Sequence, residues 1–194
     1  MGNIVFEDKD IIVYFKEAGE ESEGLAHAFT KPCFVVHRLD MPVSGLMVLA
    51  KNKKSSDILG KELQDNKIRK IYLAQVEGII DEEGTLKDYL FHDRSKNKTF
   101  TVKTLRKGAK EAELDYSIVK RYEESTLVRI KLKTGRTHQI RVQFASRKHP
   151  LLGDGKYGSR TKCSIRLCSS ELEFIHPVTK EELHFECEPD WLEK

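Results

Sequence analysis

The chain has 194 residues and a formal net charge of +3, and its composition is 39% hydrophobic and 34% charged. This balance predicts one globular domain over residues 1–194, with no transmembrane span and no secretory signal peptide. The four cysteines form no CxxC pair, so we expect reduced, buried thiols in a cytoplasmic protein.

The charges are unevenly distributed along the chain. The first 30 residues hold seven acids against two lysines, and the last 24 hold eight acids against two lysines, which leaves +14 on the middle of the chain. Three segments there carry basic residues and no acid: Arg94–Lys110, Arg129–Lys148 and Lys156–Arg166. Solvated basic faces are common, but three acid-free blocks favour a polyanion, and nucleic acid in particular, as the partner.

Hydrophobic periodicity predicts an α+β fold around a largely antiparallel sheet. We expect strands at 10–16, 45–52 and 69–78, a hairpin of 113–122 with 125–134, and short strands at 163–168 and 183–188. Helices are expected over 55–67 and from about residue 137.

Two of these elements have specific features. The helix over 55–67 is expected to have Ser55 or Ser56 as its N-cap and to bury Ile58, Leu59 and Leu63. Alternation in the strand over 69–78 places Tyr72 on the same face as Ala74 and Val76.

Several short motifs are weak. GDGKYG at 153–158 matches GxGxxG, but Pro150 precedes it and no amphipathic helix follows, so a tight turn beside a binding surface is the better interpretation. Cys163 and Cys168 lack a second pair of ligands, and we therefore predict no metal. Ser44 lacks the GxSxG context of a serine nucleophile.

Three longer segments are more informative. HRLDMPVSGL (37–46) sets Asp40 between Arg38 and a Pro-Val-Ser-Gly sequence. RKIYLAQVEG (69–78) places Tyr72 on a strand, and TGRTHQIR (134–141) concentrates polar and basic residues where a helix begins. An isolated aspartate before a strand is more often a turn residue, but the three segments together indicate a site.

In order and spacing, these segments resemble the catalytic-aspartate, tyrosine and basic motifs of the RluA family of pseudouridine synthases. The similarity extends over most of the chain, from IVFEDKDIIVYFKEAG to the last strands. Two positions depart from the family pattern: Val43 stands where threonine is usual, and Glu17 replaces the proline of Lys-Pro-Ala-Gly. Both departures concern loops.

The resemblance implies a pseudouridine-synthase-like catalytic domain, with a mixed, largely antiparallel sheet flanked by helices. By residue, Asp40 matches the nucleophile, Tyr72 the active-site tyrosine and Arg141 the basic residue paired with the aspartate. Arg38 matches the arginine that evicts the target base, and Ile140 lines the uracil pocket. Arg136, His138 and Gln139 are further candidates for RNA contact.

The predicted function is the isomerisation of specific uridines to pseudouridine in ribosomal or transfer RNA, by base flipping and without a cofactor. The aspartate could attack C1′ or C6, or assist a glycal route. We take a monomer as the default, without a separate N-terminal RNA-binding domain. The alternatives are a non-catalytic RNA-binding or remodelling module on the same fold, and a hydrolase that uses Asp40 on a nucleotide or sugar phosphate.

Overall fold

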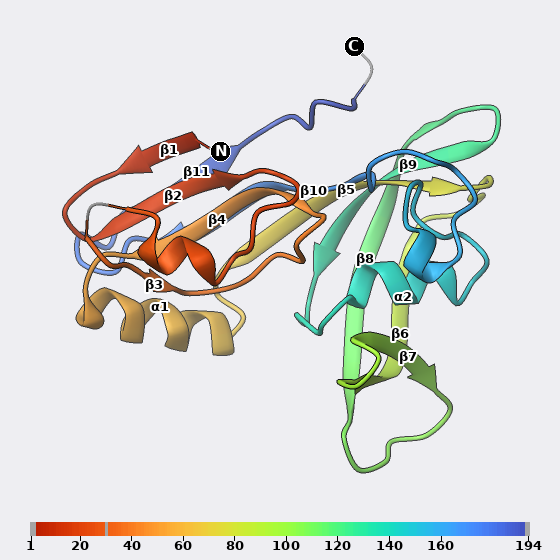
Figure 1. Ribbon diagram of the computed structural model, residues 1–194, viewed down its shortest axis with the longest axis horizontal. Coiled ribbons are helices and arrows are strands. Elements are labelled where there is room, and N and C mark those ends of the chain that lie inside the picture. Colours follow the sequence, from red (N-terminus) through yellow and green to blue (C-terminus); the bar gives the residue numbers. More distant parts are fainter. Residues whose placement is uncertain (1–2, 30, 193–194) are drawn as a thin grey trace. The chain divides into compact units, whose positions relative to one another are not determined.

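The computed structural model describes residues 3–29 and 31–192, and the chain divides into two compact units (Figure 1). Unit 1 comprises residues 1–71 and 168–194, and unit 2 comprises residues 72–167. The expectation of a single catalytic domain stays a prediction.

Most strands and one α-helix of unit 1 come from the first third of the chain. Its elements are β1 (Asn3–Glu7), β2 (Ile11–Lys16), η1 (Gly24–His27), β3 (Phe34–Val35), β4 (Ser44–Ala50), α1 (Lys53–Gln64) and β11 (Glu182–Glu186). Two strands, β5 (Arg69–Glu77) and β10 (Leu167–Ile175), carry the chain across the boundary between the units.

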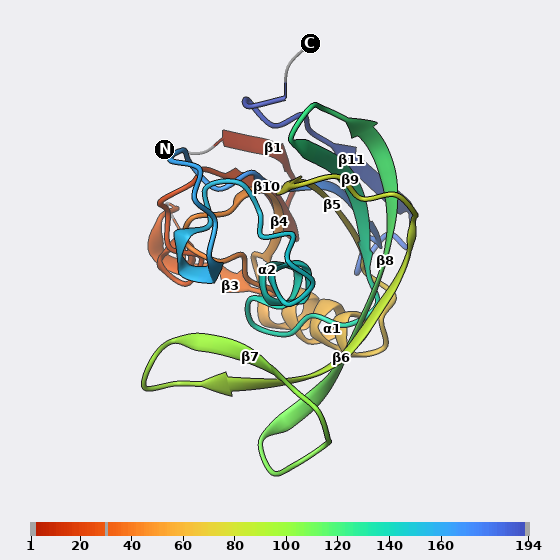
Figure 2. The same ribbon diagram turned by 90° about the vertical axis from the view of Figure 1, so that its right-hand side faces the viewer.

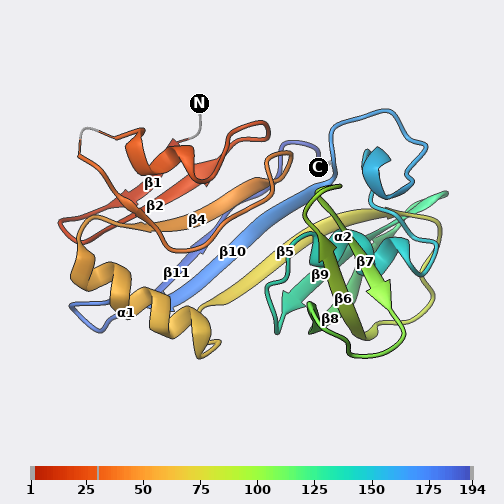
Figure 3. The same cartoon turned by 60° about the horizontal axis from the view of Figure 1, so that its bottom comes forward.

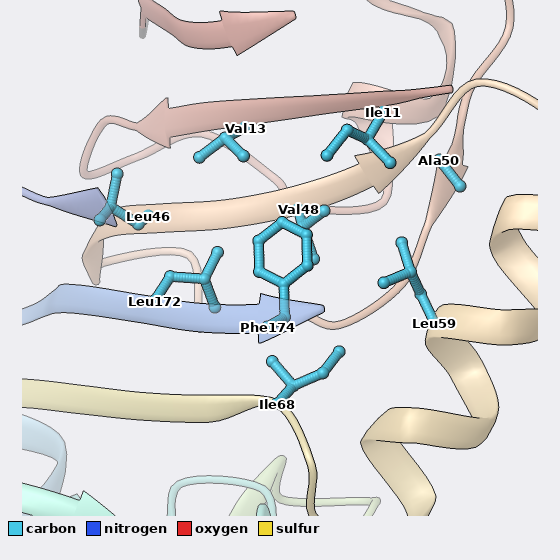
Figure 4. Close-up of a cluster of buried hydrophobic side chains, with 9 residues drawn as sticks. All are labelled: Ile11, Val13, Leu46, Val48, Ala50, Leu59, Ile68, Leu172 and Phe174. Carbon is cyan, nitrogen blue, oxygen red and sulfur yellow. The ribbon is translucent and has the colours of Figure 1, made fainter. Parts of the chain in front are cut away.

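Strand β4 is central to unit 1 and is buried along its whole length. It pairs antiparallel with β2 and β3 and parallel with β10, while β10 also pairs antiparallel with β11. Helix α1 packs against β4 (Figure 3). The side chains of Figure 4 form the core between these elements: Ile11, Val13, Leu46, Val48, Ala50, Leu59, Ile68, Leu172 and Phe174.

Gly45 explains the glycine of the Pro-Val-Ser-Gly sequence. Its φ of +124° lies where side chains are strained, and a Cβ there would lie 2.4 Å from the Ser169 carbonyl oxygen. Ser169 is the residue that pairs with Gly45 across β10 and β4. Only glycine allows β10 to approach the beginning of β4 this closely.

The N-cap of α1 was predicted wrongly. Asn52, with extended backbone (φ −147°, ψ 160°), accepts a hydrogen bond from the Ser55 amide at 2.9 Å. Its amide group also donates to Asp10 Oδ1 at 2.9 Å. Ser55 lies inside the helix and is buried, because this tertiary contact to Asp10 fixes the cap three residues earlier.

Unit 2 is built on a long antiparallel ribbon. Its elements are β6 (Gly84–Asp93), β7 (Lys98–Val102), β8 (Ala109–Arg121), β9 (Ser125–Leu132), α2 (Gln139–Ala145) and η2 (Gly155–Tyr157). Strand β8 pairs with β9 and with β6, and β6 pairs with β7. The β6–β7 hairpin extends beyond α2 (Figure 2), and Leu90, Ala112 and Val142 form a small core beneath the helix.

The predicted α+β class and the largely antiparallel sheet are confirmed. The hairpin of 113–122 with 125–134 corresponds to β8 and β9, whereas β6 and β7 were not predicted. The strand expected at 163–168 is wrong for most of that range, since β10 begins at Leu167. The carbonyls of Cys163 and Ser164 pack closely on Gly153, which holds this segment in irregular backbone. No helix in the described ranges has the length and hydropathy needed to cross a membrane.

Candidate active site

In unit 1, Asp40 stands on a turn directly before the central strand. Its carbonyl accepts a hydrogen bond from the Val43 amide at 2.9 Å, and β4 begins at the next residue. Its neighbour Leu39 is held on both sides by the buried Ser22, whose hydroxyl accepts from Leu39 N at 3.1 Å and donates to Leu39 O at 2.8 Å. The backbone that carries the half-buried Asp40 is therefore fixed locally.

A fully buried lysine supports the same turn. Lys16 is 0% exposed, and its ammonium donates to the carbonyl oxygens of Glu17 (2.9 Å), Glu20 (2.9 Å) and Met41 (3.2 Å). Burial lowers the pKa of Lys16 to about 8, against the opposing attraction of the Glu20, Asp40 and Glu17 charges. Lys16 thus joins the loop after β2 to the residue that follows Asp40.

Arg38 and His37 precede Asp40 and have opposite environments. Arg38 is 65% exposed and forms an ion pair with the equally exposed Glu23. His37 is buried, and desolvation together with the charge of Lys70 lowers its pKa to about 3. The neutral ring of His37 accepts from the Val48 amide at 3.3 Å, so its role is structural, while the guanidinium of Arg38 lies at the surface.

The remaining predicted residues lie in unit 2. Tyr72 is on β5 with 6% of its surface exposed, and it shares its buried face with Ala74 and Val76, as predicted. Ile140, on α2, is 4% exposed. Helix α2 begins at Gln139, two residues later than expected.

The side chain of Gln139 is engaged in local structure. Its Oε1 accepts from the Arg136 amide (3.0 Å) and from the Thr134 hydroxyl (2.8 Å), and its Nε2 donates to the Glu113 carbonyl (3.1 Å). Arg136 donates through Nε to the Glu111 carbonyl at 2.8 Å. These bonds fix the entry to α2, and RNA contact by Gln139 and Arg136 stays a prediction.

Arg141 forms a buried, bidentate ion pair with Asp154. Its Nε lies 2.7 Å from Asp154 Oδ2 and a terminal nitrogen lies 2.8 Å from Oδ1, with side chains only 5% and 1% exposed. The guanidinium also lies 5.1 Å from the ring centre of Tyr157. Both planar contacts orient the guanidinium in a way that a lysine could not reproduce. The expected partnership of Arg141 with Asp40 stays a prediction.

Tyr157 joins the helix entry to the β6–β7 hairpin. Its hydroxyl accepts from the Thr99 amide at 2.9 Å and lies 2.8 Å from His138 Nδ1. His138 is buried and has a positive φ of 54°, which is uncommon outside glycine. Thr99 adds a hydrogen bond from its hydroxyl to the Thr137 carbonyl at 2.9 Å.

Sequence reasoning did not identify three residues that support the site: Lys16, Asp154 and Tyr157. Asp154 and Tyr157 belong to the GDGKYG segment, which was interpreted as a turn beside a binding surface. The turn is present, with Gly153 at φ +79° and Tyr157 in the short helix η2. The sequence did offer a signal for Asp154 and Tyr157 as site residues: they lie in a glycine-rich turn soon after a basic segment.

Among the described residues of unit 1, two clusters have the residue types of a metal site. In the more exposed one, Glu171, Glu173 and His184, the histidine nitrogens lie 3.0 Å from Glu173 Oε1 and 2.6 Å from Glu186 Oε1. The more buried one consists of Asp8, Asp10 and His176. Its geometry does not suit a cation. His176 Nδ1 accepts from the amides of Val178 and Thr179, so the ring proton is on Nε2, which lies 2.9 Å from Asp8 Oδ2. A metal-bound histidine instead donates its second nitrogen to an acceptor.

Comparison with known proteins places the chain in a family. The model of the family described as RNA pseudouridylate synthase matches residues 10–146. An uncharacterized RNA pseudouridine synthase of Aquifex aeolicus is 34% identical, over 96% of this chain and 69% of that protein. Ribosomal large subunit pseudouridine synthase D of Haemophilus influenzae is also 34% identical, over 94% and 60% respectively. This chain belongs to the RNA pseudouridylate synthase family.

Pseudouridylate synthases are isomerases that convert uridine in RNA to pseudouridine, and the resemblance to the RluA type is confirmed. The fold agrees with the family. A solved structure of human RNA pseudouridylate synthase domain containing 1 superimposes with a TM-score of 0.84 at 22% identity, covering 99% of this chain and 85% of that one. Within the synthase match lie Lys16, Asp40, Tyr72 and Arg141, while the 153–158 turn lies outside it.

Proposed function

We propose that this protein isomerises specific uridines in ribosomal or transfer RNA, by flipping the target base and using Asp40 as the nucleophile. The observation that carries this proposal is the position of Asp40 within the family match, on a turn braced by Ser22 and Lys16. A reacting carboxylate must be held in a fixed position, and these contacts restrain its backbone.

Base flipping requires a group that fills the space left in the RNA. We assign this role to Arg38, because its planar guanidinium can stack on bases. Its exposed ion pair with Glu23 contributes little stability and can be exchanged for RNA at low cost. Tyr72 and Ile140, both buried, are proposed to pack against the uracil, with Tyr72 as or beside the base that moves the proton.

Ribosomal RNA is the leading substrate, since the Haemophilus relative is named for the large ribosomal subunit. Transfer RNA is the second candidate. The three basic segments would hold the RNA backbone, so affinity should fall steeply with salt. We further propose a cytoplasmic monomer.

The test is site-resolved pseudouridine mapping of total RNA from cells that lack the gene, incubated with purified protein. Wild-type protein is expected to create pseudouridine at defined sites, and Asp40→Asn to lower the rate by at least roughly 10³-fold, as expected for loss of a nucleophile. Asp57→Asn, at an exposed position on α1, is the matched control and should retain full activity.

Full activity of Asp40→Asn would overturn the proposed nucleophile. If neither protein modifies mature or partly assembled RNA while both bind it with the same salt dependence, the RNA-binding module is the better account.

A further inference from the structure

One face of the β6–β7 hairpin carries a row of aromatic and apolar side chains. Phe91 pairs with Phe100 across the two strands, and Tyr89 pairs with Val102, so that all four project on the same side. Lys98 and its cross-strand partner Asp93 follow on this side. The Asp93 carboxylate accepts hydrogen bonds from Ser95 and Lys96 of the connecting turn. We call this surface the arm face: Tyr89, Phe91, Lys98, Phe100 and Val102.

The opposite side of the hairpin packs on the rest of unit 2. Thr99 is 1% exposed and bonds to the Thr137 carbonyl, and Leu90 packs against Val142. The hairpin therefore has its core on that side. The arm face is more open, and Phe100 leaves 38% of its surface exposed although packing would favour its burial.

Cations lie over the rings of the arm face. The Arg106 guanidinium is 5.2 Å from the ring centre of Phe91. The Lys98 ammonium lies 5.9 Å from that of Phe100 and 5.2 Å from that of Tyr157, whose ring also contacts Arg141. Alternating rings and cations thus lead from the exposed Phe100 to the buried Arg141, all within unit 2.

We propose that the arm face binds unpaired nucleotides next to the target uridine, with a base stacked on Phe100 and its phosphate on Lys98. The proposal rests on the proposed function and adds a substrate class: RNA that is single-stranded beside the target. Exposed aromatic side chains on strands, interleaved with cations, are what unpaired RNA requires. The acid-free segment Arg94–Lys110 supplies the charge complementarity.

The experiment measures binding of full-length protein to a 12-nucleotide oligouridylate that carries one 2-aminopurine, whose fluorescence reports stacking. Phe100→Ala is expected to weaken binding about ten-fold and to abolish the fluorescence change, and Phe100→Trp to restore both. Lys98→Ala should reduce the salt slope of log affinity by about 0.7, the value for one phosphate contact on a single strand.

A matched pair serves as control at the other end of β8. Lys120 lies 4.8 Å over the Tyr122 ring, but Glu123 and Glu124 follow it, so this pair lacks charge complementarity to RNA. Tyr122→Ala and Lys120→Ala should leave affinity and salt slope unchanged.

Unchanged oligouridylate binding in Phe100→Ala, or an equal loss in Tyr122→Ala, would overturn the arm-face proposal. The proposal would also be overturned if the wild type bound a duplex of equal length more tightly than the oligouridylate and Phe100→Ala changed the affinity for neither of the two RNAs. Failure of the proposed function is separate, because it is read from Asp40→Asn, which should bind the oligonucleotide like the wild type.

Discussion

Lys16 in unit 1 and Arg141 in unit 2 are buried cations near predicted site residues, and they are held in different ways. In unit 1, the Lys16 ammonium donates hydrogen bonds to three backbone carbonyls, one of them in the residue next to Asp40. In unit 2, Arg141 meets the carboxylate of Asp154 through two parallel hydrogen bonds. Lys16 thus ties one stretch of backbone to another, whereas Arg141 is oriented by a charged side chain.

The two kinds of partner have different consequences for the charge and orientation of the cation. Carbonyl dipoles satisfy an ammonium without cancelling its charge, so Lys16 can stabilise the turn and still attract the Asp40 carboxylate. A carboxylate partner compensates a guanidinium and fixes its plane, which suits a residue that must present one edge in a set direction. Three substitutions test this difference.

The largest effect is expected at Arg141. Arg141→Met leaves the Asp154 carboxylate, 1% exposed, without this partner, and should lower the free energy of unfolding by about 3–5 kcal/mol. The double variant Arg141→Met with Asp154→Asn should recover part of that loss but no activity. Chemical denaturation measures the free energy of unfolding of both variants, and pseudouridine mapping measures their activity.

The control is Arg147→Met, which breaks the more exposed pair with Asp88 and should cost less than about 1 kcal/mol. Equal losses in the two single variants would show that burial of the Arg141–Asp154 pair does not matter.

Lys16→Met should have the next largest effect. It leaves buried carbonyls without their donor and should cost about 2 kcal/mol, with a fall in kcat because the Asp40 turn loosens. The pH dependence is a sharper readout. Burial lowers the pKa of Lys16 from 10.5 to about 8, so the unfolded chain binds more protons between these values and the free energy of unfolding should rise with pH there.

If Lys16 causes the rise in the free energy of unfolding with pH, Lys16→Met should abolish it. Lys53→Met, at an exposed position on α1, should leave the pH profile unaltered. A rise that persists in Lys16→Met would assign it to another group.

The smallest effect is expected for Tyr157→Phe. The variant keeps the ring against Arg141 and removes the hydroxyl that accepts from the buried Thr99 amide, at a cost of about 1–2 kcal/mol. Hydrogen exchange at the Thr99 amide should accelerate. Tyr116→Phe, which loses an exposed hydrogen bond to the Glu82 carbonyl, should change stability by less than about 0.5 kcal/mol, and a similar loss there would contradict the role of Tyr157.

The strands next to Asp40 and under Tyr72 could be predicted from the sequence pattern. Continuous burial of β4 and alternation in β5 follow from side-chain periodicity, which reports the buried face whatever lies across it. The motif order also identified the family before any geometry was known, and with it Asp40, Tyr72 and Arg141 as candidates.

Strands β6 and β7 were not predicted, because β7 lies in a polar, basic segment and the apolar residues of β6 do not alternate regularly. Lys98–Val102 is five residues long, and its strand conformation depends on pairing with β6. Local propensity is too weak to specify such a strand, since cross-strand contacts supply much of its stability.

The partners of the buried polar groups depend on the folded chain and could not be predicted from the sequence. Lys16 reaches a carbonyl 25 residues away, and the Tyr157 hydroxyl meets an amide 58 residues away. A buried donor or acceptor must be paired, and the sequence shows that requirement. Which group satisfies it depends on what the folded chain brings within hydrogen-bonding distance, and no local pattern encodes that choice.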